Sequence, residues 1–148
     1  MGRAWLEENH TRTAGVWLLS VRGRANVGVG YEDAVRQALC FGWIDGPVRT
    51  FDDTTVGQWF SPRRTSSGWA ATNKARIVQL EAEGMLAPAG IRVIEAAKAN
   101  GTWTLLDGPE AGIEPAELTA ALDAVPAARA GWDAFPPSAR KLGLTHIA

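Results

Sequence analysis

Side chains able to bind a charged ligand are concentrated between residues 38 and 74 of this 148-residue sequence. Arginine forms planar two-point hydrogen bonds with carboxylates and phosphates, and tryptophan offers a large apolar wall. The candidate ligand-binding residues are Trp43, Asp45, Arg63, Arg64, Trp69, Asn73 and Lys74. This set predicts a pocket for a small molecule or peptide that carries an anionic group.

Trp43 and Asp45 begin an expected strand, so strand alternation places both side chains on one face, with Ile44 on the other. An acid beside an indole receives a cation or amine, or orients an arginine. In a second interpretation Asp45 is a turn or salt-bridge residue. Asp45 is also the candidate catalytic acid or base.

Arg63 and Arg64 follow Pro62 at the end of another expected strand, where alternation sends them to opposite faces. One of the two could clamp an anion, together with Lys74, while the other pairs with Asp52, Asp53 or solvent. The alternative is that both arginines form salt bridges on the surface or between elements.

Asn73 lies on the apolar stripe of an expected helix, together with Trp69, Ile77 and Leu80. A buried amide without hydrogen-bond partners costs about 1 to 3 kcal/mol, so this one needs partners. Asn73 therefore either ties down a neighbouring loop or faces a ligand.

Residues suited to other kinds of catalysis are scarce. His10 lies in a helix-to-strand connection and His146 at a chain end, and no metal-ligand motif occurs, so we expect neither a metal nor a cofactor. Cys40 lies off the apolar stripe of its helix and away from a helix N-terminus that would activate its thiol. A single cysteine excludes an internal disulfide and favours a reducing compartment.

The formal net charge of −1 gives no global case for a polyanionic partner, so nucleic-acid binding would need a local patch. No run approaches the roughly 20 apolar residues of a membrane span. Polar residues at positions 7 to 9 interrupt the stretch that a signal peptide requires. We therefore expect a cytoplasmic protein that does not bind membranes.

Periodicity and turn residues predict an α+β fold with a small, mostly antiparallel sheet, packed helices and a short helical C-terminal section. The expected helices and strands of the first part are helix 3–9, strand 15–22, a Gly-rich turn over 23–30, helix 31–41, and strands 43–50 and 56–61. Gly28 and Gly30 do not belong to a dinucleotide-binding fingerprint, because no G-x-G-x-x-G follows a strand and opens a helix.

Helical patterns dominate the rest of the chain. They predict a helix over 69–83 with an N-cap among residues 65–67, and a helix over 88–100 with Gly101 as C-cap. A linker follows over 105–115. Three more helices are predicted over 114–125, over 126–135 and from Pro137 onward. We expect a core domain over 1–104 that contains the ligand site. Residues 105–148 then form a linker and a helical section packed on this core.

The stretch from Tyr31 to Gly46 resembles the signature of the YdeI/OmpD-associated, or bacteriocin-protection, family. Three further blocks strengthen the resemblance, and they lie at Phe60-Ser-Pro-Arg-Arg64 with Ser67 and Trp69, at Asn73-Lys74 with Arg76, and from Gly84-Met85 to Gly101-Thr-Trp103. The resemblance covers roughly residues 3 to 147. Family members usually continue into a basic helix with a Thr-Arg-x-x-Arg type segment, which this sequence lacks.

The resemblance implies a small bacterial α+β protein linked to tolerance of antimicrobial peptides or bacteriocins, without a settled chemistry. Together with the pocket residues it favours a small-molecule or peptide binding protein that serves resistance or sequestration. Two alternatives stay open. One is a small enzyme that acts on an anionic metabolite or natural product with Asp45 as acid or base, and the other is a local nucleic-acid surface with stacking aromatics.

Overall fold

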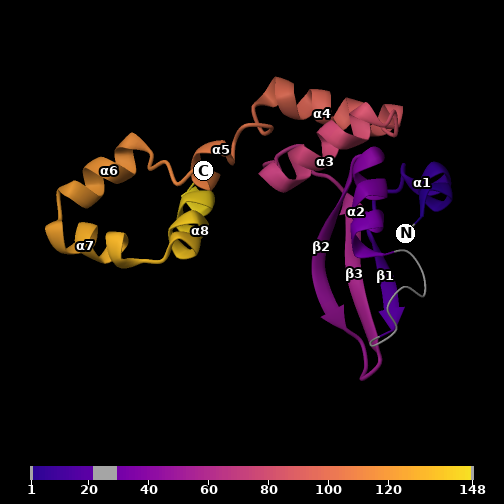
Figure 1. The fold of residues 1–148 in the computed structure, drawn as a ribbon, viewed down its shortest axis with the longest axis horizontal. Helices are drawn as coiled ribbons and strands as arrows, with labels where there is room; N and C mark the ends of the chain where they lie inside the picture. Colours follow the sequence, from indigo (N-terminus) through magenta and orange to yellow (C-terminus); the bar gives the residue numbers. More distant parts are fainter. Residues whose placement is uncertain (1, 22–29, 148) are drawn as a thin grey trace.

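The computed structural model describes residues 2–21 and 30–147, and this part of the chain forms one three-stranded antiparallel sheet and eight helices (Figure 1). The elements are α1 (Arg3–Asn9), β1 (Val16–Val21), α2 (Tyr31–Cys40), β2 (Trp43–Thr50), β3 (Thr55–Pro62), α3 (Ala71–Ala82), α4 (Pro88–Asn100), α5 (Asp107–Glu110), α6 (Ala116–Asp123), α7 (Pro126–Ala134) and α8 (Pro137–Ile147). The predicted α+β class is confirmed. The turn expected over 23–30 lies outside the described residues, except for Gly30.

The sheet has the order β1-β3-β2, with both neighbouring pairs antiparallel. The β2–β3 hairpin is closed by Asp52, whose Oδ1 accepts the backbone N–H groups of Thr54 and Thr55 at 2.8 and 2.7 Å. These bonds and the Thr54 hydroxyl lower the pKa of the Asp52 carboxyl to about 2. The turn predicted between these strands therefore forms through its aspartate.

The core lies between one face of the sheet and the apolar stripe of α2. Ala34, Val35, Ala38 and Leu39 are buried, as the amphipathic pattern predicts. Phe60 of β3, at 0% exposure, belongs to the same cluster. Burial of these side chains holds helix and sheet together.

Helix α4 approaches the end of α2 so closely that only glycine fits at two positions. A Cβ atom on Gly90 would collide with the backbone carbonyl of Cys40, and one on Gly42 would lie 2.7 Å from Val93. Gly42 also ends the α2 segment at a φ of 76°, a conformation that glycine adopts without strain. The same packing buries the Cys40 thiol and raises its pKa, which makes it a poor nucleophile.

Three aromatic side chains gather on the sheet face that points away from Phe60. Trp17 contacts Trp59 with ring centroids 5.1 Å apart, and it contacts Phe51 at 5.4 Å. Phe51 is 44% exposed. Two tryptophans are therefore partly buried outside the main core cluster of the described residues.

Helix α3 begins two residues later than the sequence predicts, and its predicted N-cap among residues 65–67 is wrong. Its N-cap is Ala70, which has no capping side chain. The first free N–H group, that of Ala71, instead donates to Glu110 Oε2 at 2.8 Å. A carboxylate from 39 residues away thus takes the part of a local cap, which no local motif reveals.

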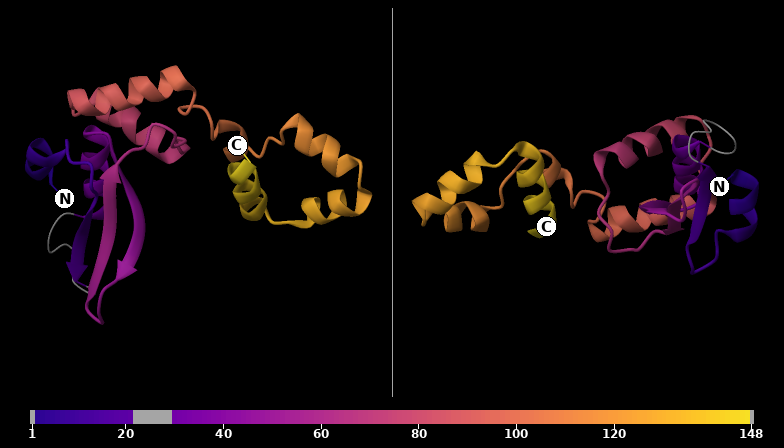
Figure 2. Two further views of the ribbon diagram at one scale, coloured as in Figure 1. Left: turned by 180° about the vertical axis from the view of Figure 1, so that it is seen from behind. Right: turned by 90° about the horizontal axis from the view of Figure 1, so that it is seen from below.

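The expected linker contains α5, which connects the sheet-containing part to the C-terminal helices. Asp107 of α5 pairs with Lys74 of α3, and Lys141 of α8 pairs with Glu110 at 3.3 Å. Figures 1 and 2 show α6, α7 and α8 as a group beyond α5, to one side of the sheet. The division of the chain at residue 104 stays a prediction.

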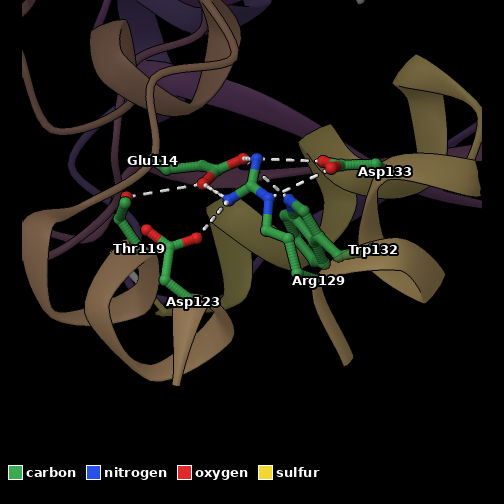
Figure 3. A network of polar contacts seen from close by, with 6 residues as sticks. All are labelled: Glu114, Thr119, Asp123, Arg129, Trp132 and Asp133. Carbon is green, nitrogen blue, oxygen red and sulfur yellow. Dashed lines mark hydrogen bonds and ion pairs between the residues drawn. The ribbon is translucent and has the colours of Figure 1, made fainter. Parts of the chain in front are cut away.

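Glu114 is the centre of a polar network in the C-terminal helices (Figure 3). It accepts hydrogen bonds from Arg129 Nη1 at 2.6 Å, from Trp132 Nε1 at 2.9 Å and from Thr119 Oγ1 at 3.4 Å. Arg129 also pairs with Asp133 at 2.9 Å. These donors lower the pKa of Glu114, with Arg129 the largest cause. The network joins the segment before α6 to α7.

The close approach of α4 can be tested with Gly90→Ala. The added methyl group must displace either α4 or the end of α2, so we expect a loss of about 1 to 3 kcal/mol of unfolding free energy in denaturant titrations. Gly2→Ala is the matched control, because a Cβ there meets nothing within 4 Å. Equal stability of the two variants would contradict the described packing.

The Glu114 network predicts a pH dependence. Because the folded-state pKa of Glu114 lies below its ordinary value of 4.5, its contribution is present above about pH 4.5 and is lost as the pH falls through the lowered value. At pH 7, Glu114→Gln should reduce the hydrogen-exchange protection of residues 112–147. In this variant the protection should also fall less steeply as the pH is lowered. The control Glu117→Gln removes a nearby exposed carboxylate and should leave protection unchanged. A Glu114→Gln profile that matches the control would refute the role of the network.

Candidate functional site

A cavity of about 310 Å³ lies where the end of α2, the adjoining ends of β2 and β3, the segment after β3 and one side of α4 meet. Its lining residues come from all of these elements and from the end of α1. They are His10, Thr11, Phe41, Gly42, Trp43, Pro62, Arg63, Arg64, Thr65, Trp69, Ala89, Arg92, Val93, Ala96, Ala97 and Thr102. Four of the seven predicted ligand-binding residues thus line the cavity: Trp43, Arg63, Arg64 and Trp69.

Arg63 is held in one orientation by the segment that follows it. Its guanidinium carbon lies 3.8 Å from the ring centre of Trp69, and its Nη2 donates to the carbonyls of Gly68 and, at 3.5 Å, Ser67. Its Nε is buried and has no hydrogen-bond partner in the described part of the chain. Burial lowers the pKa of Arg63 to about 10, although the charge of Asp45 opposes this effect.

Arg64 and Arg92 are exposed and border the same cavity. Strand alternation predicts opposite orientations for Arg63 and Arg64, and the two differ in burial, since Arg63 is half-buried and Arg64 is exposed. Both still reach one cavity because β3 ends at Pro62, so strand alternation no longer governs the residues beyond it. Within the described residues neither Arg64 nor Arg92 forms an ion pair.

Trp43 is 1% exposed and forms part of the cavity floor. Its Nε1 donates to the backbone carbonyl of His10 at 3.0 Å, and its ring meets Trp5 edge-on at 5.8 Å. His10 in turn places its Nδ1 3.0 Å from the carbonyl of Leu6. An indole bound at both its nitrogen and its ring gives the cavity a wall of fixed position.

The cavity has a local charge that the whole chain lacks. Three arginines line it and none of its sixteen lining residues is acidic, whereas the chain has a formal net charge of −1. A half-buried guanidinium such as that of Arg63 attracts anions more strongly than one in open solvent. The arrangement is therefore an anion-attracting cavity with aromatic walls.

Asp45 lies outside the cavity lining. Its Oδ2 accepts a hydrogen bond from the Tyr31 hydroxyl at 2.7 Å, which joins β2 to the first residue of α2. The hydrogen bond to Asp45 is the largest cause of a raised pKa at Tyr31. Trp43 and Asp45 do share a sheet face, but the carboxylate is directed to α2 while the indole meets α1.

Asn73 and Lys74 also lie outside the cavity lining. Asn73 Oδ1 accepts from Arg76 Nη1 at 2.9 Å, and Arg76 forms two hydrogen bonds with Glu32, at 2.8 and 2.7 Å. Since α3 begins at Ala71, Trp69 does not share a helical stripe with Asn73. Lys74 pairs with Asp107 and lies 5.7 Å from the ring centre of Trp103. Lys74 therefore connects α3 to α5, and Asn73 supports Arg76, which connects α3 to α2.

The polar cavity residues that the sequence does not predict are His10, Arg92 and the three threonines Thr11, Thr65 and Thr102. In the sequence His10 stands in a helix-to-strand connection, and Arg92 lies within a helix whose exposed face carries ordinary charges. Their convergence depends on the approach of α4 to α2, which the Gly90 and Gly42 contacts permit. No spacing within a single element signals this convergence.

Taken together, the fold and the cavity define a small α+β protein with a basic, tryptophan-walled site. Residues 2–93 match the family model of a domain of unknown function, DUF8412. Because the match spans more than half of the chain, the protein belongs to this family. Residues 112–148 match the family described as "Bacteriocin-protection, YdeI or OmpD-Associated".

This second, partial match is consistent with the family resemblance expected from the sequence, but it falls on the C-terminal helices and not on the blocks between residues 31 and 103. The Glu114 network lies within it. No curated protein and no solved structure matches the chain. In the described residues no helix is both long and apolar enough to cross a membrane.

The structural role of Asp45 can be tested through Tyr31, which is the single tyrosine of the chain. Because its pKa is raised above the ordinary value of 10.0, tyrosinate absorbance should appear late in an alkaline titration. Asp45→Ala should move the midpoint down toward 10.0. Circular dichroism recorded at each pH separates this change from unfolding. An unchanged midpoint would show that the two side chains do not interact.

Proposed function

We propose that this protein binds a small anionic molecule in the cavity between α2, α4 and the segment after β3. The observation that carries the proposal is the presence of Arg63, Arg64 and Arg92 around one cavity without any acidic lining residue. Such a set of guanidinium groups suits a carboxylate or phosphate.

Arg63 is the anchor of the proposed site. Its guanidinium is stacked on Trp69 and bound to two carbonyls, so little side-chain entropy remains to be lost on binding. Its charge is partly dehydrated and forms no ion pair within the described residues, and burial lowers its pKa although the charge of Asp45 opposes this effect. A bound anion supplies an opposite charge, so its interaction with Arg63 is more favourable than with a fully hydrated arginine.

Binding, and not acid–base catalysis by Asp45, is the activity that the geometry favours. Asp45, the candidate acid or base, is bonded to Tyr31 and lies outside the cavity lining. A general acid or base has to reach the proton that it transfers, either directly or through one water. Asp45 is thus better placed to join β2 to α2 than to act on a ligand in this cavity.

The C-terminal helices suggest a biological setting for this binding. Their match is to a family whose description names bacteriocin protection. We propose that the protein sequesters an antimicrobial compound, or a metabolite connected with tolerance to one, in the bacterial cytoplasm. In this proposal the C-terminal helices are an attached module and the cavity is the binding site.

Isothermal titration calorimetry with acetate, benzoate and inorganic phosphate tests the proposed function. At least one probe should bind, and the double variant Arg64→Ala/Arg92→Ala should weaken that binding about tenfold or more, because two of three cavity cations are lost. Both residues are exposed, so folding should be preserved.

Arg49→Ala is the matched control for charge. Arg49 is an exposed cation on β2 that lies 5.1 Å from the Phe51 ring, away from the cavity lining. Its loss should leave the affinity unchanged at constant ionic strength. If no probe binds, or if Arg49→Ala weakens binding as much as the double variant does, the proposed function is wrong.

A further inference from the structure

We infer that the ligand of this cavity is a small monocarboxylate with an apolar body, such as an aryl carboxylate. The inference rests on the proposed function and specifies its ligand class. Three features carry it: the size of the cavity, the composition of its walls, and the donors that Arg63 leaves free.

The size of the cavity favours a metabolite over a peptide. A volume of about 310 Å³ lies at the lower end of the range of roughly 300 to 1,000 Å³ that is common for small-molecule sites. Peptide grooves are extended surfaces with successive side-chain pockets. This cavity is bounded by α4 on one side and by the segment after β3 on the other, so it holds one compact group.

The walls of the cavity are largely apolar. Helix α4 contributes only small or branched aliphatic side chains besides Arg92, namely Ala89, Val93, Ala96 and Ala97. These short side chains leave the space that a ligand body would fill. A charged group without an apolar body would leave this surface in contact with water and gain nothing from it.

The aromatic walls are fixed in position. Trp69 is 1% exposed and lies 4.9 Å from Trp103, and its backbone N–H donates to Thr102. Trp43 is held by Trp5 and by the carbonyl of His10. Because each of these indoles is 1% exposed, it limits the depth of the cavity and offers a ligand little surface of its own.

The anchor for the charged group is a single fixed guanidinium. Arg63 uses Nη2 for backbone carbonyls and its Nε is buried, while its Nη1 makes no hydrogen bond to any described residue. A carboxylate carries one charge, which matches that of the single half-buried guanidinium, and it can accept a hydrogen bond from Nη1. A phosphate monoester brings close to two charges and three oxygens, and burying it beside one fixed cation leaves more charge uncompensated.

Arg64 and Arg92 fit this assignment because they are exposed at the border of the cavity. Exposed cations steer an anion toward the opening and are screened by salt. They therefore contribute to affinity without demanding a second buried negative charge. The chemistry that results is one dehydrated carboxylate on Arg63 and one apolar ring against α4.

Calorimetric titrations at constant ionic strength with benzoate, acetate, phenyl phosphate, inorganic phosphate and neutral benzamide test this ligand class. We expect benzoate to bind about tenfold or more tightly than acetate, because only benzoate buries an aromatic ring. Benzoate should also bind more tightly than phenyl phosphate, which has the same ring, and more tightly than benzamide, which has the same shape without the charge.

The variant Ala96→Leu adds bulk to the α4 wall and leaves the arginines in place. Ala96 is exposed, so the variant should fold, and thermal denaturation verifies this. Benzoate affinity should fall about tenfold while acetate affinity stays constant. Loss of both affinities to the same extent would contradict a ring site beside α4.

The outcomes separate the inference from the proposed function. If acetate or inorganic phosphate binds as tightly as benzoate and still depends on Arg64 and Arg92, the ligand class is wrong and the proposed function stands. If phenyl phosphate binds more tightly than benzoate, the monocarboxylate assignment fails. If benzamide equals benzoate, or if no probe binds in an arginine-dependent manner, both the ligand class and the proposed function fail.

Discussion

The stacking of the Arg63 guanidinium on Trp69 determines much of the local structure around the cavity. A half-buried cation has to replace its lost water, and here the carbonyls of Ser67 and Gly68 and the face of an indole do so. To reach these partners the chain stays non-helical from residue 63 to residue 70. Helix α3 therefore begins only at Ala71, and the cavity stays open between residues 63–70 and α4.

The opposite wall depends on how closely two backbones approach each other. Gly90 lies against the carbonyl of Cys40, and Gly42 turns the chain directly after α2. These contacts hold α4 beside the ends of β2 and β3, which brings Arg92 within reach of a cavity whose other cations follow β3. The basic site is therefore a property of tertiary packing, in a chain that is slightly acidic as a whole.

Much of the fold could be predicted from local patterns. The bounds of α4, including its start at Pro88 and its left-handed cap at Gly101, agree with the prediction because each signal lies within the helix or beside it. The start of α3 could not be predicted, because its cap is the distant carboxylate of Glu110. For the site, cation and tryptophan content indicated Trp43, Arg63, Arg64 and Trp69. Long-range contacts decided that Asp45 meets Tyr31 and that Arg92 joins the cavity.

The central claim is that an anion binds at the guanidinium of Arg63, and a nuclear magnetic resonance titration of the arginine Nε–H groups tests it most directly. The Arg63 signal, assigned by its absence from Arg63→Lys, reports on a buried Nε that lacks a partner in the described structure. We predict that this signal moves progressively and saturably as benzoate is added, while the signal of Arg49 stays in place. A stationary Arg63 signal at benzoate concentrations that saturate binding by calorimetry would contradict the account.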